Sequence, residues 1–418
     1  MGLEFIPGAD PAVAEALTGE LAHQRGSLYL VASGNYLSPA VLEAQGAVVA
    51  NERAEGYPGA RYFAGCDHVD EIEELAIERA RELFGADHVN VQPHSGTQSN
   101  MGVYVAVLDP GDTILSLELS HGGHLSHGHP ANFAGQYYDI VQYGIDLETG
   151  RIDYDELAAT AREHDPAMIV TGFSAYPREI DWERVQSVAD EVGAYHMADI
   201  AHITGLVAAD EHPSPVGVVD FVTGSTHKSL RAGRGGFIMC DADYASDIDA
   251  GVFPGSQGDP LMHNVAGKAV GFREALEHEF EEYAAQVVAN ADALAATLTE
   301  HGLELLSGGT DTHLLLIDLR ESHPDMTGKD AESILETVGV VLNANPVPGD
   351  TRPPTVTSGI RIGTPAVTTR GLDESDMETL GELVVRALDN PDDDETIAAI
   401  GDRVDDLCDA HPLYEQYD

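Results

Sequence analysis

The sequence predicts an α/β protein, with a mostly parallel sheet in a large domain and a smaller C-terminal α+β domain. A chain of 418 residues is long enough for two or three domains around a sizeable core. Up to about residue 280, short apolar runs alternate with amphipathic helical segments, which is typical of a parallel sheet covered on both faces. After about residue 281, long helices and few strands indicate a second, α+β domain.

Three parts are expected along the chain. Residues 1–28 form an N-terminal arm with one helix, because apolar residues recur at helical spacing after Pro11. Residues 29–280 form the large domain, and residues 281–418 form the small domain, which ends in an acidic, solvated helix. A helix is expected over 68–85. The expected strands are 89–91, 113–117, 168–171, 195–199, 221–223, 236–240, 314–318 and 339–344.

The charge balance limits the partners. The chain has 72 acidic and 21 basic side chains, and its formal net charge of −51 is spread along the sequence. Nucleic acid is not an expected partner, because phosphate neutralisation needs a basic face. An acidic surface of this density repels itself unless salt screens it, which predicts adaptation to a salt-rich cytoplasm. The three lysines are Lys228, Lys268 and Lys329, so lysine chemistry must use one of them.

Cysteine usage and hydropathy indicate a reducing compartment. Cys66, Cys240 and Cys408 are odd in number and widely separated, which does not fit a disulfide framework. No segment approaches the ~18 apolar residues of a membrane span, and the N-terminus lacks a basic leader before an apolar core. We therefore expect a cytoplasmic protein without a membrane partner.

Ser95, Gly96 and Thr97 follow the strand 89–91 and open a helix. The free backbone N–H groups and the dipole of a helix N-terminus favour a phosphate. A simple helix cap is the alternative for a Ser-Gly-Thr sequence in this place.

Asp199 ends the strand 195–199, and His202 follows three residues later. Because ligands bind beyond the carboxyl ends of parallel strands, this carboxylate is expected in the binding crevice. There it can hold a pyridine nitrogen protonated, which makes pyridoxal phosphate an electron sink. A helix-capping aspartate is the alternative.

Lys228 lies in a loop rich in Ser, Thr and Gly between two strands. A lysine whose neighbours depress its pKa can form a Schiff base with an aldehyde cofactor. Most lysines are solvated surface groups, but a chain that has so few of them makes this one a candidate.

His121, His124 and His127 recur at a spacing of three residues. A metal cluster is one interpretation, but no carboxylate ligand adjoins them, and we expect no metal. An imidazole that stacks on a cofactor ring is the favoured interpretation.

These segments occur together in the order typical of one family. The chain resembles serine hydroxymethyltransferase, a family of fold type I pyridoxal-phosphate enzymes, over nearly its whole length. With the acidic composition, the resemblance predicts a halophilic archaeon as the source. The matching segments are 54–62, 91–100, 121–128, 173–181, 199–209, 226–236, 252–264, 307–314 and 358–371.

The resemblance implies how the cofactor is held. Lys228 would form the Schiff base with pyridoxal 5'-phosphate, Asp199 would pair with the pyridine nitrogen, and His124 would stack on the ring. His227, beside Lys228, would be a further catalytic residue. The other implied cofactor residues are Ser95, Gly96 and Thr97 at the phosphate, His202 and Ser174 at the phenolic oxygen, and Gly258 from the neighbouring subunit.

The resemblance also implies the substrate contacts. Arg361 would bind the carboxylate of serine or glycine with its planar fork of donors. Glu55, from the neighbouring subunit, would be the acid/base group near the hydroxymethyl carbon. A homodimer follows, which could pair into a tetramer. The other substrate-binding positions, which include the folate contacts, are Ser33, Leu119, Gly123, His124, Leu125 and Asn345.

The expected reaction is the reversible transfer of the hydroxymethyl carbon of serine to tetrahydrofolate, which gives glycine through aldimine and quinonoid chemistry. The alternative is a folate-independent aldolase that acts on β-hydroxy amino acids such as threonine and uses the same cofactor. A non-catalytic binding subunit is a third interpretation, against which the intact Lys228, Asp199, His124, Arg361 and Glu55 argue.

Some positions depart from the family pattern, namely Gly34, Arg53, Phe63, Asp259, Thr355 and the segment 231–234. Asp259 adds a carboxylate to a segment that, by resemblance, approaches the cofactor phosphate of the neighbouring subunit. Arg53 replaces a tyrosine that reaches the same phosphate. We expect Arg53 to lie between Asp259 and the phosphate and to compensate for the added charge. An Arg53 that points to solvent is the alternative.

Low salt should destabilise the protein and its expected dimer, because the repulsion among 51 uncompensated negative charges is then unscreened. The Debye length falls from about 10 Å at about 0.1 M salt to about 3 Å at about 1 M. The measurement is the melting temperature and the dimer fraction at these two salt concentrations. Equal values at both would contradict the prediction.

Overall fold

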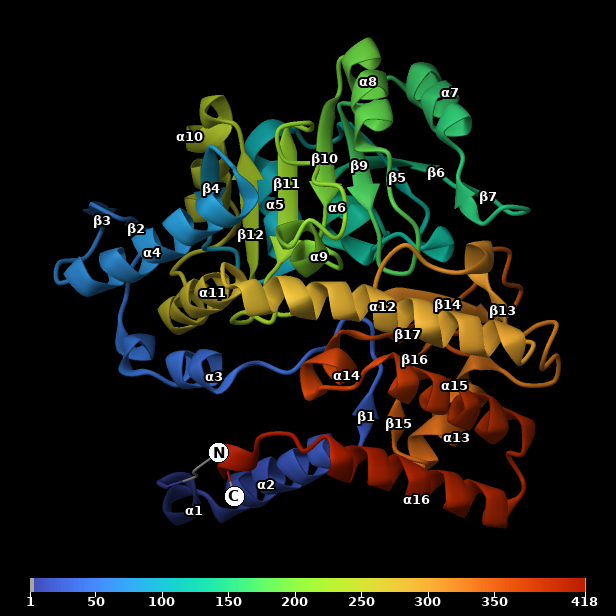
Figure 1. The fold of residues 1–418 in the computed structure, drawn as a ribbon. Coiled ribbons are helices and arrows are strands. Elements are labelled where there is room, and N and C mark those ends of the chain that lie inside the picture. The colour runs from blue at the N-terminus through green and yellow to red at the C-terminus, as the bar shows by residue number, and fades with distance from the viewer. Residues whose placement is uncertain (1–3, 418) are drawn as a thin grey trace. The chain divides into compact units, whose positions relative to one another are not determined.

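The computed structural model describes residues 4–417 and divides into two compact units (Figure 1). Unit 1 combines the chain up to Tyr36 with the chain from Gln286 onwards, and unit 2 comprises Leu37–Ala285. The second boundary falls within helix α12 (His278–Glu300). The domain bounds expected from the sequence stay a prediction, and residues 1–3 of the expected arm lie outside the described residues.

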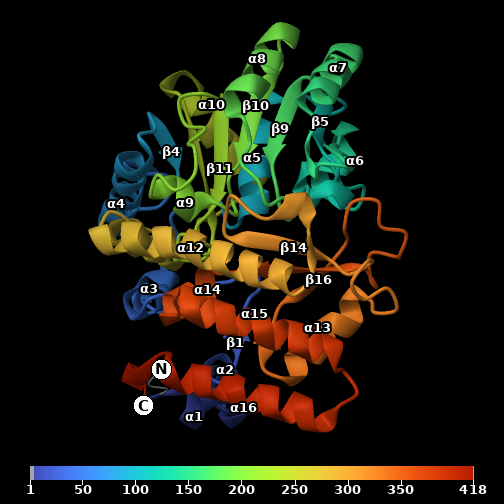
Figure 2. The same cartoon turned by 45° about the vertical axis from the view of Figure 1, so that its right-hand side comes forward.

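A seven-stranded sheet forms the core of unit 2 (Figure 2). Its order is β4-β12-β11-β10-β9-β5-β6. The pairs from β11 to β6 are parallel, and β12 is antiparallel to both of its neighbours. The predicted mostly parallel α/β architecture is therefore confirmed. The bounds are β4 (His88–Asn90), β5 (Thr113–Leu117), β6 (Asp139–Tyr143), β9 (Met168–Gly172), β10 (Tyr195–Asp199), β11 (Phe221–Ser225) and β12 (Gly236–Cys240).

The strand predictions succeed where a strand is buried on both faces. Every residue of β9, β11 and β12 is buried, as expected for continuous apolar runs inside a covered sheet. β5, β10 and β12 have the predicted bounds. The edge strand β6 was not predicted, and its burial is mixed, with Asp139 and Gln142 exposed.

Helices pack on this sheet, and α4 (Asp67–Phe84) confirms the predicted helix. α5 (Gly96–Val107) packs on β11 and β12, α8 (Trp182–Val192) on β10, and α7 (Tyr154–His164) on β6. The other elements of unit 2 are α3 (Pro39–Gln45), η1 (Val48–Asn51), β2 (Gly56–Tyr57), β3 (Ala60–Arg61), η2 (Leu119–His121), η3 (Leu125–His127), α6 (Phe133–Tyr137), β7 (Ile145–Asp146), β8 (Arg151–Ile152), α9 (Thr204–Ala208), η4 (Ala242–Tyr244), α10 (Ala245–Ala250), η5 (Gly251–Ser256) and α11 (Met262–Ala275).

Unit 1 is built on a four-stranded antiparallel sheet in the order β13-β14-β17-β16, which fits the predicted α+β class. A parallel pair of short strands, β1 with β15, brings the N-terminal segment into this unit. Its elements are α1 (Ile6–Ala9), α2 (Pro11–Arg25), β1 (Leu28–Tyr29), β13 (Glu304–Leu305), η6 (Leu306–Gly308), β14 (Leu314–Asp318), α13 (Gly328–Thr337), β15 (Val340–Val341), β16 (Asn343–Asn345), β17 (Gly359–Gly363), α14 (Pro365–Arg370), α15 (Glu374–Asp389), α16 (Asp394–Ala410) and η7 (Glu415–Tyr417).

Two expectations for unit 1 were wrong in detail. The apolar run 339–344 is not one strand but two, because β15 pairs with β1 whereas β16 pairs with β17. The terminal helix α16 is not solvated all round. It buries Ile400, Val404 and Leu407 in the core of unit 1, and its acidic residues cover the other face.

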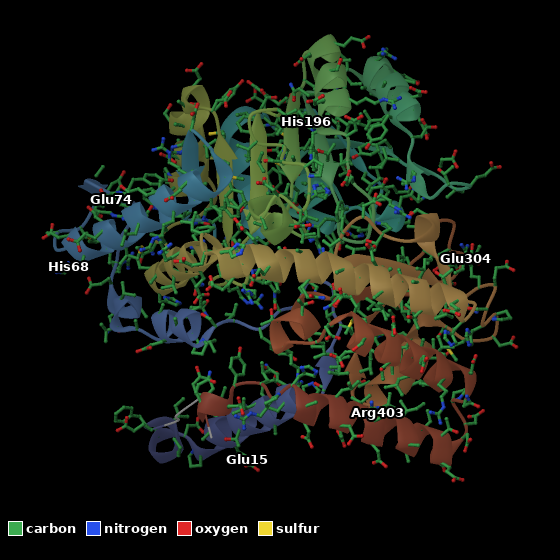
Figure 3. The ribbon with its side chains drawn as sticks, viewed as in Figure 1. Glu15, His68, Glu74, His196, Glu304 and Arg403 are labelled. Carbon is green, nitrogen blue, oxygen red and sulfur yellow. The ribbon has the colours of Figure 1, made fainter. Side chains whose placement is uncertain are left out.

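Among the described residues, the acidic side chains other than Glu73 and Asp199 are at least partly exposed. Figure 3 shows Glu15, Glu74 and Glu304 pointing outward, whereas His196 lies among the strands. Within residues 4–417, no helix is both long enough and apolar enough to cross a membrane.

Arg370, at the end of α14, ties the terminal segments of unit 1 together. Its buried guanidinium donates to the carbonyl oxygens of Ser27 at 2.8 Å, Arg25 at 2.5 Å, Cys408 at 3.0 Å and His411 at 2.7 Å. These carbonyls lie at or just after the C-terminal ends of α2 and α16, where backbone acceptors have no partner inside the helix. The guanidinium of Arg370 thus supplies hydrogen-bond donors to backbone carbonyls at the ends of both helices.

Replacing Arg370 with Met should lower the free energy of unfolding by about 3 kcal/mol or more, because several buried carbonyls lose their donor. The control is Arg403→Met, which removes an exposed pair with Asp406 and should change stability by less than about 1 kcal/mol. Urea unfolding at molar salt measures both variants. Equal midpoints for the two variants would show that Arg370 is not a structural centre.

Candidate functional site

Unit 2 contains a cavity of about 230 Å³ at the carboxyl ends of β10 and β11. This is the edge of a parallel sheet at which ligands bind. The lining residues are His94, Ser95, Gly96, Thr97, His124, Phe173, Asp199, Ala201, His202, Ser225, His227, Lys228 and Arg234. The structure therefore brings together eight of the residues predicted from the sequence.

The segment Ser95–Thr97 opens helix α5, as predicted. The backbone of Ser95 is extended, and its Oγ accepts the N–H of Gln98 at 3.3 Å, so the helix cap is present. A Cβ on Gly96 would lie 2.5 Å from Oγ of Ser225, so a larger residue here would require the Ser225 side chain to move. Ser95, Gly96 and Thr97 line the cavity, and phosphate binding there stays a prediction.

Asp199 ends β10, and its carboxylate is buried. Oδ2 accepts Nε2 of His127 at 2.9 Å and Nδ2 of Asn100 at 2.8 Å, and Oδ1 accepts the N–H of Ala201 at 2.9 Å. Burial by itself raises the pKa of Asp199, but the side-chain hydrogen bonds donated by His127 and Asn100 favour the carboxylate and hold this pKa well below its usual range. Asp199 is therefore ionised at neutral pH. It does not cap α9, whose N-cap is Ile203.

Hydrogen bonds fix the protons of the two neighbouring histidines. Nδ1 of His124 accepts the N–H of Ser126 at 3.2 Å, so the proton of the neutral ring is on Nε2. Nδ1 of His127 accepts the N–H of His124 at 3.4 Å, which leaves Nε2 to donate to Asp199. His121 instead accepts the N–H of Ile145. His121 is therefore outside the group, but ligand atoms of His124, His127 and Asp199 lie within 4.8 Å of one another. The expectation that no carboxylate adjoins these histidines was wrong, because β10 brings Asp199 to them from a distant part of the chain. The expected absence of a metal stays a prediction.

The loop that carries Lys228 packs against small residues of α11. The N–H of Gly233 donates to the carbonyl of Gly267 at 3.1 Å, a bond that a proline cannot make. A Cβ on Gly271 would lie 2.2 Å from Cβ of Ala232, so the alanine fills the space that this glycine leaves. Oγ1 of Thr226 donates to the carbonyl of Gly233 at 2.5 Å and closes the loop.

His227 is a neutral side chain of the cavity wall. Burial, and then the charges of Arg234 and Lys228, lower its pKa to about 3. Its Nδ1 atom is buried and has no hydrogen-bond partner among the described residues. His202 lines the same cavity, whereas Ser174 is outside its lining and donates its N–H to the carbonyl of Gly122 at 2.7 Å.

Other predicted residues of unit 2 lie on loops outside the cavity lining. Leu119 and Leu125 expose 39% and 48% of their surface, which is much for apolar side chains. Gly123 is buried, and a Cβ there would lie 2.2 Å from the carbonyl oxygen of Leu117. Gly258 is exposed.

Ser33, Arg361 and Asn345 belong to unit 1. Arg361 lies on the central strand β17 and is buried, and its Nε donates to Oδ1 of Asn343 at 3.1 Å. Burial lowers the pKa of Arg361 to about 10. Asn345 is on β16, and Ser33 is half-buried in the loop after β1. Nothing in the structure explains Thr355, which is exposed.

Several residues that orient the predicted site residues through hydrogen bonds were not predicted from the sequence. Asn100 accepts from Oγ1 of Thr223 at 2.6 Å and donates to Ser126 at 2.9 Å, and so fixes its own contact with Asp199. His127 was considered only as a metal ligand. No local signal points to these partners, because the residues come from different strands and helices.

Lys268, on α11, is also a missed residue, although the scarcity of lysine could have drawn attention to it. Its fully buried Nζ donates to the carbonyls of Val91 at 2.6 Å, Pro93 at 2.9 Å and Gly236 at 2.8 Å. Val91 and Pro93 lead into the Ser95 cap. Lys268 therefore supports the loop that shapes one wall of the cavity.

The fold and the site together define the class of protein to which the chain belongs. A mostly parallel sheet with a lysine loop and a buried carboxylate at the carboxyl ends of its strands is the arrangement expected of a fold type I pyridoxal-phosphate enzyme.

The comparisons with known proteins agree with this class. A family model of serine hydroxymethyltransferase matches residues 6–384. Proteins named serine hydroxymethyltransferase from Halorubrum lacusprofundi, Halobacterium salinarum and Haloarcula marismortui are 62%, 63% and 63% identical over 415 residues, which covers 99% of this chain and 100% of each relative. The chain belongs to the serine hydroxymethyltransferase family. The predicted family is confirmed, and relatives from halophilic archaea fit the acidic composition.

Lys268 should make stability depend on pH. Burial lowers its pKa from 10.5 to about 7. Between these values the unfolded chain binds more protons than the folded chain, so the free energy of unfolding rises as the pH increases from about 7 to about 10. Urea unfolding between these pH values measures the slope.

The variant Lys268→Met should be destabilised, because three buried carbonyls lose their donor at about 1–3 kcal/mol for an unsatisfied group. It should also lose the pH slope. The matched control Lys329→Met replaces an exposed lysine and should keep both stability and slope. A slope that persists in Lys268→Met would assign the titration to another group.

Proposed function

We propose that this chain interconverts serine and glycine, with tetrahydrofolate as the one-carbon carrier and pyridoxal 5'-phosphate as the cofactor. One observation carries the proposal: Lys228, Asp199, His124 and the Ser95 helix start line one cavity. Membership of the family and full-length relatives that bear its name support the reaction. The same names do not favour the folate-independent aldolase.

The residues of the cavity fit the cofactor. The ionised Asp199 suits a protonated ring nitrogen, and the helix N-terminus at Gly96 suits a phosphate. The buried Nδ1 of His227 offers a polar atom that no described residue satisfies. When bound, pyridoxal phosphate supplies an electron sink for bond breaking at the α-carbon of an amino acid.

The residues of the cavity and their neighbours would then have the following tasks. Asp199 would hold the proton of the ring nitrogen, and His127 and Asn100 would keep its carboxylate charged and oriented. Lys228 would anchor the cofactor through its ε-amine, and His124 would cover the ring. The remaining cofactor residues would be Ser95, Gly96, Thr97, Ser174, His202, His227 and Gly258.

The substrate contacts implied by the family resemblance remain part of the proposal. Arg361 would bind the carboxylate of the amino acid, with its guanidinium oriented by Asn343. The exposed leucines Leu119 and Leu125 offer apolar contact for the aromatic rings of a folate. The other substrate positions would be Ser33, Gly123 and Asn345.

Glu55 would accept or return the proton of the hydroxymethyl oxygen. Its proposed place in the site of a second subunit rests on the resemblance to the family. We therefore propose a homodimer, and also a cytoplasmic location in keeping with the acidic surface and the free cysteines.

Lys228→Ala should abolish the visible absorbance of the bound cofactor and the turnover of serine, because the ε-amine is the anchoring group. Lys329→Ala is the control and should keep both, since Lys329 is an exposed residue of α13. Absorbance spectra and serine turnover at molar salt measure the outcome. Retained cofactor absorbance at full intensity in Lys228→Ala would move the anchor elsewhere.

The same assay, run with and without tetrahydrofolate, tests the reaction. We expect glycine formation from serine to depend on the folate. Equal rates in its absence would favour the aldolase reaction and contradict the proposed function.

A further inference from the structure

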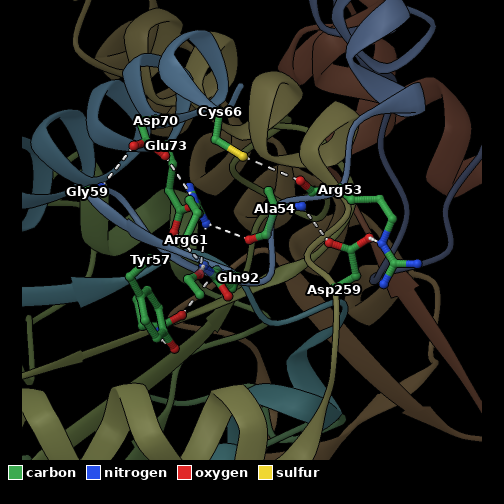
Figure 4. Close-up of polar contacts among 12 residues, drawn as sticks. Arg53, Ala54, Tyr57, Gly59, Arg61, Cys66, Asp70, Glu73, Gln92 and Asp259 are labelled. Carbon is green, nitrogen blue, oxygen red and sulfur yellow. Dashed lines mark hydrogen bonds and ion pairs between the residues drawn. The ribbon is translucent and has the colours of Figure 1, made fainter. Parts of the chain in front are cut away.

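Arg53 contacts two other positions that depart from the family pattern, Asp259 and Phe63. Nε of Arg53 lies 3.4 Å from Oδ2 of Asp259, and its guanidinium carbon lies 5.2 Å from the ring centroid of Phe63. Figure 4 shows Arg53 beside Asp259. The expected pairing of these two residues is thus present. A contact of Arg53 with a phosphate stays a prediction.

The same guanidinium reaches a residue that the sequence analysis did not connect with it. Nη2 of Arg53 lies 2.5 Å from Oε1 of Glu55. Arg53 therefore bridges two carboxylates, one on its own segment and one on the segment after η5. Without the cation, Glu55 and Asp259 would be like charges that repel each other.

The backbone on both sides of Glu55 is already fixed (Figure 4). Oδ1 of Asp259 accepts the N–H of Ala54 at 2.8 Å. Nη1 of Arg61 donates to the carbonyls of Ala54 and Gly56, each at 2.8 Å. The freedom that remains to Glu55 is the rotation of its side chain.

Arg61 is itself rigidly held. Its side chain is 3% exposed and pairs with Glu73 at 2.6 Å and with Asp70 at 2.8 Å. Nε2 of Gln92 donates to both Glu73 and the carbonyl of Gly56. A buried network thus anchors the segment, and an exposed arginine contacts its carboxylate.

We propose that Arg53 is a positioning residue, which holds the carboxylate of Glu55 in one orientation and is itself held by Asp259 and Phe63. Asp259 acts twice, through Oδ1 on the backbone of Ala54 and through Oδ2 on Arg53. The inference deepens the proposed function, because it rests on Glu55 as the acid/base group.

The effect on catalysis follows from orientation. A misplacement of about 1 Å in a reacting group can cost about a hundredfold in rate. Arg53→Ala should therefore lower kcat for folate-dependent serine turnover by about ten- to a hundredfold, with KM for serine little changed. Arg53→Lys should recover part of kcat, because it keeps the charge but not the fork of donors.

A double-mutant cycle with Glu55→Gln separates positioning from general destabilisation. If Arg53 acts through Glu55, Arg53→Ala should cause no further loss of kcat in the Glu55→Gln background. A merely structural role predicts losses that multiply. The matched control is Arg162→Ala, which removes an exposed arginine paired with Glu191 at 2.7 Å and should leave kcat unchanged in both backgrounds.

Asp259→Asn keeps an oxygen for the N–H of Ala54 while it removes the charge. Added to Arg53→Ala, it should restore part of kcat, because the carboxylate that repels Glu55 is gone. A further loss in this double variant would overturn the proposal.

Two other outcomes are distinguishable. If Arg53→Ala raises the concentration of pyridoxal phosphate needed for half-maximal absorbance at least tenfold but keeps kcat at saturation, Arg53 serves the phosphate and the positioning role is wrong. If the unmodified protein does not turn over serine with folate, the proposed function fails. The inference is then decided by urea unfolding of the Arg53 and Glu55 single and double variants, where strictly additive midpoint shifts would overturn it.

Discussion

The buried carboxylate of Asp199 is the constraint on which the architecture of unit 2 depends. An unpaired buried charge costs several kcal/mol, so donors must converge on it. They come from separate elements, with His127 on η3 and Asn100 on α5. Asn100 is oriented in turn by Thr223, which stands opposite Asp199 in the register of β10 and β11. The sheet register, the start of α5 and the histidine loop therefore cannot shift independently.

The few basic residues show a second constraint. With 72 acidic and 21 basic side chains, the surface is left to acids, and several of the remaining cations are buried. Arg61, Lys268 and Arg370 each donate to two or more backbone carbonyls. Salt screens exposed charges far more than buried ones, so these contacts persist in a salt-rich medium. These three basic residues lie where buried carbonyls need a donor, whereas others, such as Arg162 and Arg403, are exposed and pair with carboxylates.

Burial and separation along the chain explain which parts of the structure could be predicted from the sequence. The buried strands were found because continuous apolar runs mark them, and Asp199 was found because it ends such a run. Lys228 was found because lysine is scarce and because its loop is rich in Ser, Thr and Gly. The edge strand β6 carries no such pattern. Asn100 lies 99 residues from Asp199, and Lys268 lies 177 residues from Val91, so periodicity has no access to these contacts.

Chain connectivity limited the remaining predictions. The run 339–344 was expected as one strand, but hydrophobicity does not reveal that two different partners divide it between β15 and β16. The acidic composition of α16 concealed its apolar stripe, because the charged residues outnumber the buried ones. The contacts of Arg53 with Glu55 and Phe63 arise from the path of one loop, which composition does not determine.

The departures from the family pattern are best understood together with their neighbours. A Cβ on Gly34 would lie 2.0 Å from the ring of Tyr29, so the glycine makes room for that tyrosine. Ala232 fills the space that Gly271 leaves. Phe63 lacks a hydroxyl, but its ring supports the guanidinium of Arg53, an attraction that does not require the hydroxyl. In each case the changed residue packs against a neighbour that accommodates it. The effect of such a change on the site is therefore smaller than the changed residue alone would indicate.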